Sequence, residues 1–124
     1  MKVRVNKIKG TQIFFSCENG DAICIWKSKA EPTLETTYDV ELDINGSISD
    51  LQIPNPEVGE YFIHAKLDYS TINGRLESVE SDGMGFLRLS DDCLIMIETG
   101  SARLSEGQWI KLEIHYSKLV IYGL

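Results

Sequence analysis

Two stretches of this sequence alternate apolar and polar residues, and they constrain the fold more than any other feature. In Tyr38–Ile44 (YDVELDI) every second residue is apolar, and the same alternation returns seventy residues later in Gln108–Ile114 (QWIKLEI). A period of two residues is typical of a β-strand with one buried face. The sequence therefore predicts two equivalent half-buried strands. The segments before them also match, which suggests one small β unit that occurs twice.

Short alternating segments, separated by turn residues, cover most of the remaining chain. Asn-Gly pairs, which favour two-residue hairpin turns, begin at Asn19, Asn45 and Asn73. Residues 28–37 contain a proline and no sustained helical period, so we interpret them as a loop. The further predicted strands are residues 3–9, 11–18, 21–27, 47–53, 61–69 and 75–81.

The two halves of the chain repeat one order of apolar positions. Two prolines in residues 54–56 prevent regular strand pairing, and they predict a boundary between a first unit, 1–57, and a second unit, 58–124. Units of about sixty residues are marginal alone, so we expect the two to pack tightly together. The matched positions are Arg4-Val5 with Arg75-Leu76, Phe14-Phe15 with Phe86-Leu87, and Ile23 and Ile25 with Ile95 and Ile97.

Five strands per unit, in the order hairpin, long loop, hairpin, are typical of a small closed barrel. In strand phase and spacing, the chain resembles the oligonucleotide/oligosaccharide-binding (OB) fold or a relative of it. The predicted fold class is all-β: two tandem five-stranded barrel-like units, OB-like or SH3-like, packed together with one extra strand at 61–69. A single β-sandwich is the alternative, because it would leave the apolar alternation unchanged.

Composition restricts the classes of partner. The chain has 12 basic and 19 acidic residues, a net charge of −7. This charge disfavours binding to a nucleic-acid backbone and favours a basic protein partner. No apolar run approaches the ~18 residues of a membrane helix, so we expect a cytoplasmic protein that binds no membrane. The cysteines, Cys17, Cys24 and Cys93, form no CxxC pair, and we expect buried thiols, no metal site and no cofactor.

Three acidic residues form the first candidate binding surface. Strand period places Asp39, Glu41 and Asp43 in a column on one face, about 7 Å apart. Such a column could dock a basic partner. In the alternative interpretation, Lys2 and Arg4 on a neighbouring first strand lie opposite these acids and neutralise part of the column.

Aromatic residues form the second candidate surface. Phe14 and Trp26 are predicted on the outer face of the first barrel, with Phe86 and Arg88 on that of the second. In an OB-like barrel this surface binds ligands, and its aromatic rings could stack on bases. Trp109 also has an outward phase, so either the rest of the chain or a partner should cover it. The side chains expected inside the first barrel on these strands are Ile13, Phe15, Ile23 and Ile25.

The chain offers little support for catalysis. His64 and His115 lie on separate predicted strands, with no serine or cysteine in a recognisable nucleophile setting, and we expect no enzyme activity. The predicted function is a non-catalytic protein-binding module, for example an acidic immunity or inhibitor protein that neutralises a basic partner such as a nuclease toxin. One alternative is an OB-like binder of single-stranded nucleic acid or oligosaccharide. Another is a structural subunit of a homo-oligomer.

Overall fold

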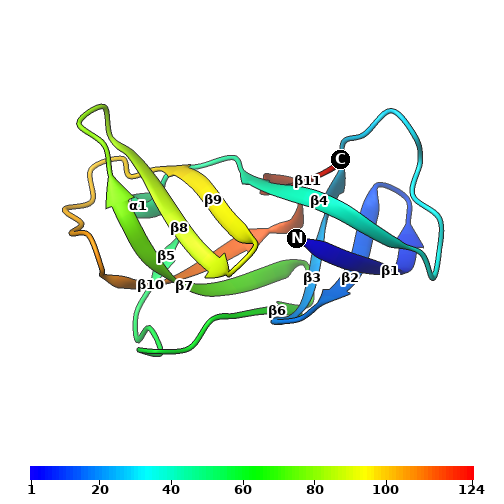
Figure 1. Cartoon of the computed structure of the whole chain (residues 1–124), viewed down its shortest axis with the longest axis horizontal. Coiled ribbons are helices and arrows are strands. Elements are labelled where there is room, and N and C mark those ends of the chain that lie inside the picture. Colours follow the sequence, from blue (N-terminus) through cyan, green and yellow to red (C-terminus); the bar gives the residue numbers. More distant parts are fainter.

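The computed structural model describes residues 1–124 and contains two β lobes. The first lobe is a closed barrel of five strands (Figure 1). Strand β11 closes this barrel, parallel to β3 and antiparallel to β4. The closed barrel confirms the predicted all-β, barrel-like fold, and a single sandwich does not describe it. The strands, in spatial order, are β1 (Lys2–Lys9), β2 (Gln12–Cys17), β3 (Gly20–Trp26), β11 (Leu119–Gly123) and β4 (Thr37–Ile44).

The second lobe contains the remaining six strands. Strand β7 is its centre, because it pairs with β6, β8 and β10. Strand β9 pairs only with β8, and β5 pairs only with β10. The strands are β5 (Gln52–Ile53), β6 (Phe62–Lys66), β7 (Tyr69–Val79), β8 (Met84–Ser90), β9 (Cys93–Glu98) and β10 (Trp109–His115).

The two lobes exchange the segments that complete them. After β4, the chain leaves the first barrel through the short helix α1 (Ile48–Leu51), and β5 then pairs with β10 in the second lobe. After β10, the chain passes through the 3₁₀ turn η1 (Tyr116–Lys118) and returns as β11, which lies beside β4 in Figure 1. The division into units 1–57 and 58–124 stays a prediction about domains. In space, however, neither lobe is one continuous half of the chain.

Strands β4 and β10 bury the faces that their alternation of apolar and polar residues predicts. Val40, Leu42 and Ile44 on β4 are at most 7% exposed, and the three apolar residues at alternate positions of β10 are fully buried. A single hydrophobic cluster of 24 buried residues draws on both lobes. The lobes therefore share an apolar core, which agrees with the expectation that neither half is stable by itself.

Strand β3 has the opposite phase from the predicted one. Its Cys24 pairs directly with Ile13 of β2, so both side chains point into the first barrel. Ile23 turns away from this interior, yet it is only 1% exposed, because it lies where β3 contacts β7. There Ser70 accepts a hydrogen bond from the Ile23 N–H, at 2.9 Å. Placing Ile23 and Ile25 inside the barrel was wrong, because a strand covered on both faces carries apolar residues in both phases.

The Asn73-Gly74 pair is not a hairpin turn. It lies within β7, and the β6–β7 turn falls at Leu67-Asp68, where Leu67 has a positive φ of 55°. Asn73 is fully buried, and its side chain bonds to the backbone of residues 57 and 60. Gly74 is required not to form a turn but to let two backbones approach closely, since a Cβ atom there would overlap the carbonyl oxygen of Arg88.

The predicted strand at 47–53 is largely wrong. Ile48–Leu51 form α1, and only Gln52–Ile53 extend as β5. Ile48 and Leu51 are both buried, and a spacing of three residues puts them on one helical face. Neither α1 nor any other helical segment has the length and apolar character needed to cross a membrane.

Candidate functional site

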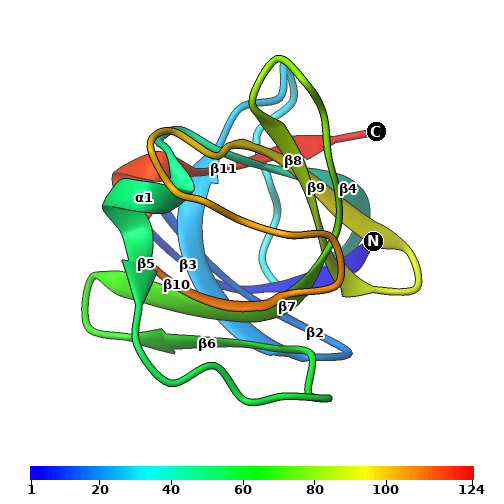
Figure 2. The ribbon, with the colours of Figure 1, turned by 90° about the vertical axis from the view of Figure 1, so that its left-hand side faces the viewer.

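An open groove lies where β4 of the first lobe meets β9 of the second. Figure 2 shows β4, β8 and β9 on the same side of the molecule. The groove has a volume of about 550 Å³. A second hollow of about 360 Å³ extends it toward Gly46, and the two share Asp43 and Met96. We name this surface the β4–β9 groove; its lining includes Glu41, Asp43, Phe86, Asp92, Leu94, Met96, Tyr122 and Leu124.

Four apolar side chains of the groove are exposed to solvent. Leu94 is 42% exposed, Met96 51%, Tyr122 38% and Leu124 79%. They come from β9 and from the end of the chain around β11, so the exchange of closing segments brings them together. Exposed apolar residues that gather in a hollow with a polar rim mark interaction sites more often than single ones do.

The predicted column of acids divides into two parts. Asp39 lies opposite Lys2 on β1, and the Lys2 Nζ is 3.4 Å from Asp39 Oδ1. This confirms the alternative interpretation for Lys2, whereas Arg4 lies opposite Thr37 and not opposite an acid. Glu41 and Asp43 form no ion pair, and both line the groove. The acidic face that is open to a partner therefore consists of these two carboxylates.

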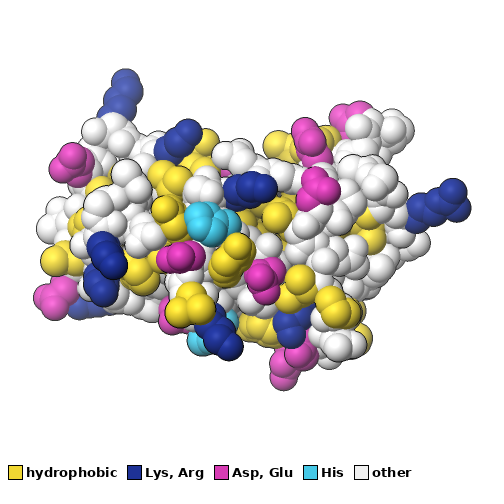
Figure 3. Space-filling view, turned by 180° about the vertical axis from the view of Figure 1, so that it is seen from behind, with side chains coloured by type: hydrophobic (Ala, Val, Ile, Leu, Met, Phe, Trp, Pro, Cys, Tyr) yellow, Lys and Arg dark blue, Asp and Glu magenta, His cyan; other side chains and the backbone are white.

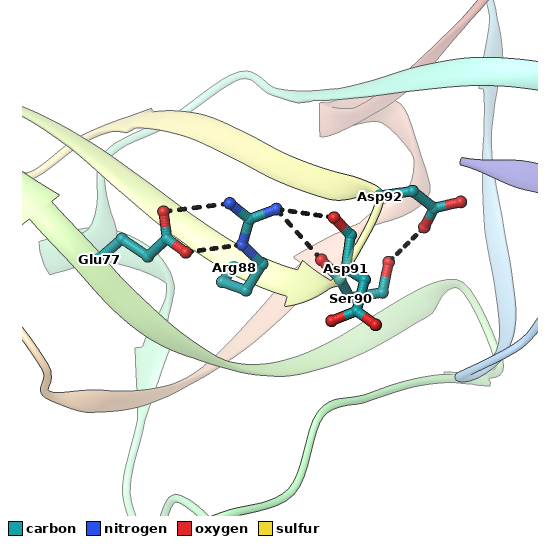
Figure 4. Close-up of polar contacts among 5 residues, drawn as sticks. All are labelled: Glu77, Arg88, Ser90, Asp91 and Asp92. Atoms are coloured by element: carbon teal, nitrogen blue, oxygen red, sulfur yellow. Dashed lines mark hydrogen bonds and ion pairs between the residues drawn. The ribbon is translucent and has the colours of Figure 1, made fainter.

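Arg88 is fully engaged within the protein (Figure 4). Its Nε and Nη2 atoms donate to the two carboxylate oxygens of Glu77, at 2.8 and 3.1 Å. Its Nη1 atom donates to the carbonyls of Ser90 and Asp91, at 3.3 and 3.2 Å. The bonds from Arg88 hold the pKa of Glu77 below its usual value and raise the pKa of Arg88. Arg88 thus fixes the β8–β9 turn instead of presenting a free cation.

Asp92 adds a third acid at the end of the groove. The Ser90 hydroxyl donates to its carboxylate at 2.7 Å, as Figure 4 shows, and this bond lowers the pKa of Asp92. A carboxylate that accepts a hydrogen bond is stabilised in its charged form. The Arg88 contacts and the Ser90 bond together keep the turn ordered and its acid ionised.

The predicted aromatic surface is not one surface. Trp26 has the inward phase of Cys24, packs against the barrel core and against Tyr38 at 5.0 Å between centroids, and donates from Nε1 to the Ala30 carbonyl. Its predicted outward position was wrong, for the same reason as that of Ile23. Phe14 does point outward, half-buried, with Lys7 Nζ 5.3 Å from its ring centroid.

Trp109 is covered from within the chain. It is half-buried and packs against Tyr61, with 4.9 Å between ring centroids. Of the predicted aromatic residues, only Phe86 lines the β4–β9 groove. The sequence patterns did not select three further residues that line the groove, Leu94, Tyr122 and Leu124. The sequence CLIMIE of β9, which is apolar in both strand phases, was the one indication that the outer side of this strand is not simply solvated.

The titratable groups give no metal cluster. No three or more His, Cys, Asp or Glu side chains lie close enough together to hold an ion. His64 contacts Asp21 at 3.2 Å. His115 contacts the Ser117 hydroxyl at 2.7 Å, but it also accepts from the Ser117 N–H, which makes this a local cap of η1. The absence of enzyme activity stays a prediction.

The opposite face has a different character. Figure 3 shows acidic, basic, apolar and histidine side chains interspersed there, without a broad field of one charge.

No protein-family model, no curated protein and no solved structure matches this chain.

Proposed function

We propose that this protein is a non-catalytic binding module whose partner is a protein with a basic surface segment, held in the β4–β9 groove. The observation that carries the proposal is the combination of two carboxylates outside any ion pair, Glu41 and Asp43, with the exposed apolar side chains of Leu94 and Met96. Apolar contacts supply most of the binding free energy, and the acids select a cationic partner.

Binding of single-stranded nucleic acid receives less support. Arg88 is neutralised by Glu77, and Phe14 and Trp26 do not share a face with Phe86. A nucleic-acid groove needs cations along the backbone path and aromatic rings on which bases stack. The groove instead contains acids, and a chain of net charge −7 repels phosphate.

Inhibition of a basic partner is the specific form of this function that we favour. An acidic surface increases the rate of association with a cationic target. A protein of this kind would cover a basic active site, as an immunity protein covers that of a nuclease toxin. The partner's active site would then be blocked without any chemical reaction on this chain.

The experiment compares capture by three immobilised proteins. The wild type is tested beside a groove variant, Glu41→Lys with Asp43→Lys, and beside a control variant, Glu106→Lys with Glu113→Lys. The control makes the same charge change at exposed residues outside the groove. We expect a basic protein that binds the wild type and the control but not the groove variant. Once purified, this partner should associate with the wild type more slowly as the salt concentration rises. Equal capture by all three proteins would contradict the proposal.

A further inference from the structure

One wall of the β4–β9 groove is an unpaired strand edge. Strand β9 is hydrogen-bonded along one side to β8, and no strand pairs with its other side. Strand β4 approaches this side without pairing with it, and the only backbone bridge there is the parallel one between Ser47 and Glu98, at the end of the strand. An edge without a partner presents a row of free N–H and C=O groups, to which another extended chain can add.

The register identifies the backbone groups on that edge. In an antiparallel pair, hydrogen-bonded and non-hydrogen-bonded positions alternate. The Thr99 N–H donates to the segment that leads into β8, so this position is a bonded one. The register then places Ile97 and Ile95 in bonded positions. The N–H and C=O groups of Leu94 and Met96 therefore point to the free edge.

Two of the residue types that usually protect an edge are absent from β9. Its sequence, CLIMIE, contains no lysine and no proline, and its only charged residue is Glu98. Leu94 and Met96, whose backbone groups are unpaired, also have exposed side chains. An apolar edge of this kind promotes pairing unless a partner covers it.

We propose that the partner contributes an extended segment that adds to β9 as a further strand, hydrogen-bonded to the backbone of Leu94 and Met96. Lysine or arginine side chains of that segment would lie against Glu41 and Asp43 on the opposite wall. In this mode of recognition, main-chain bonds provide affinity and side-chain contacts provide specificity. The inference rests on the proposed function, because it names the part of the basic partner that occupies the groove.

A second copy of this chain is a poorer occupant. Pairing two β9 edges would bring together the acids Glu41, Asp43 and Asp92 of both copies, in a chain of net charge −7. Like charges that face each other across an interface oppose association. The charge of the groove therefore selects a cationic segment of another protein.

The probe for the test is the synthetic peptide acetyl-VKVKVKVK-amide, titrated into the ¹⁵N-labelled protein at about 50 mM salt, where surface charges are weakly screened. We expect resonance shifts at Glu41 and Asp43. At saturation, amide hydrogen exchange at Leu94 and Met96 should slow by about tenfold or more. The amides of Ile95 and Ile97, already bonded to β8, are the internal controls and should not change.

Modified peptides separate backbone pairing from charge attraction. Two further peptides carry N-methyl groups at alternate residues, one in each phase, and keep every charge. Strand addition requires that at least one of them binds about tenfold more weakly, which corresponds to 1.4 kcal/mol. The peptide acetyl-VEVEVEVE-amide, with the charges reversed, should not bind.

The outcomes distinguish this inference from the proposed function. If the parent and both N-methylated peptides bind alike, and exchange at Leu94 and Met96 is unchanged, strand addition is refuted while side-chain docking of a basic protein remains. Failure of the parent peptide to bind also overturns the inference, whereas the capture experiment judges the proposed function independently. A dimer in sedimentation that protects Leu94 and Met96 without peptide would show that a second copy is the occupant.

Discussion

Removal of residues 119–124 tests the exchange of closing segments between the lobes. Strand β11 buries Leu119 and Ile121 in the hydrophobic core and Val120 on its other face, and each of the three is at most 1% exposed. Full burial of such a side chain stabilises by about 1.5 to 3 kcal/mol, so the three together represent about 4.5 to 9 kcal/mol. The whole free energy of unfolding of a domain is only about 5 to 15 kcal/mol.

The truncation also opens the first barrel. Loss of β11 exposes the edges of β3 and β4, which it bridges. We therefore expect the shortened chain to lose its cooperative unfolding transition, measured by circular dichroism, and its dispersed NMR spectrum. A synthetic peptide of residues 116–124, added in excess, should restore both. The matched control lacks only Leu124, which is 79% exposed, and should unfold at nearly the same temperature as the full chain.

A different outcome would refute the reasoning. If the first half formed its barrel alone, residues 119–124 would be a dispensable end of the second half. The truncated protein would then keep a cooperative transition within a few degrees of the wild type. Such a result would mean that β11 lies on the first barrel without completing it.

Three further predictions concern single side chains. Asn73→Ala leaves buried backbone groups at residues 57 and 60 without partners, and should lower the free energy of unfolding by about 1 to 3 kcal/mol in a urea titration. The bond from Arg88 lowers the pKa of Glu77, so its contribution to folding stability is complete above the usual glutamate pKa and is lost as pH falls through the lowered pKa. The difference in free energy of unfolding between the wild type and Glu77→Gln should therefore shrink in acid. Burial raises the pKa of all three thiols, that of Cys93 to about 11, but only Cys17 is partly exposed, so iodoacetamide at pH 8 should modify Cys17 first, as mass spectrometry would show.

Local patterns in the sequence predicted strands well where one face is buried and the other solvated. The alternation in β4 and β10 specified both the strand and its buried face, because apolar residues on only one side exclude the other register. The cross-strand pair of Lys2 and Asp39 followed from the same phase. The inward face of strand β3 could not be predicted in this way. The second lobe covers its outer face, so Ile23 and Cys24, which point to opposite sides, are both buried and both apolar.

The candidate site could be predicted only in part. Glu41, Asp43 and Phe86 were selected from strand phase, and the structure places all three at the groove. Leu94 and Tyr122 could not be selected with them, because the residues come from β9 and β11, and nothing in either segment shows that the two meet. Asn73 was misread for a related reason: the preference of Asn-Gly for turns is local, whereas its burial depends on the loop that packs over it.

The sequence by itself determined the all-β class, most of the strands and the side of β4 and β10 that faces the core, since each follows from a period of two residues within one segment. Only the tertiary structure decided which strands become neighbours. Backbone hydrogen bonds between strands carry almost no information about residue type, so β11 could have completed either lobe. Its place in the first barrel, and the free edge that this arrangement leaves on β9, depend on how the two lobes pack as a whole.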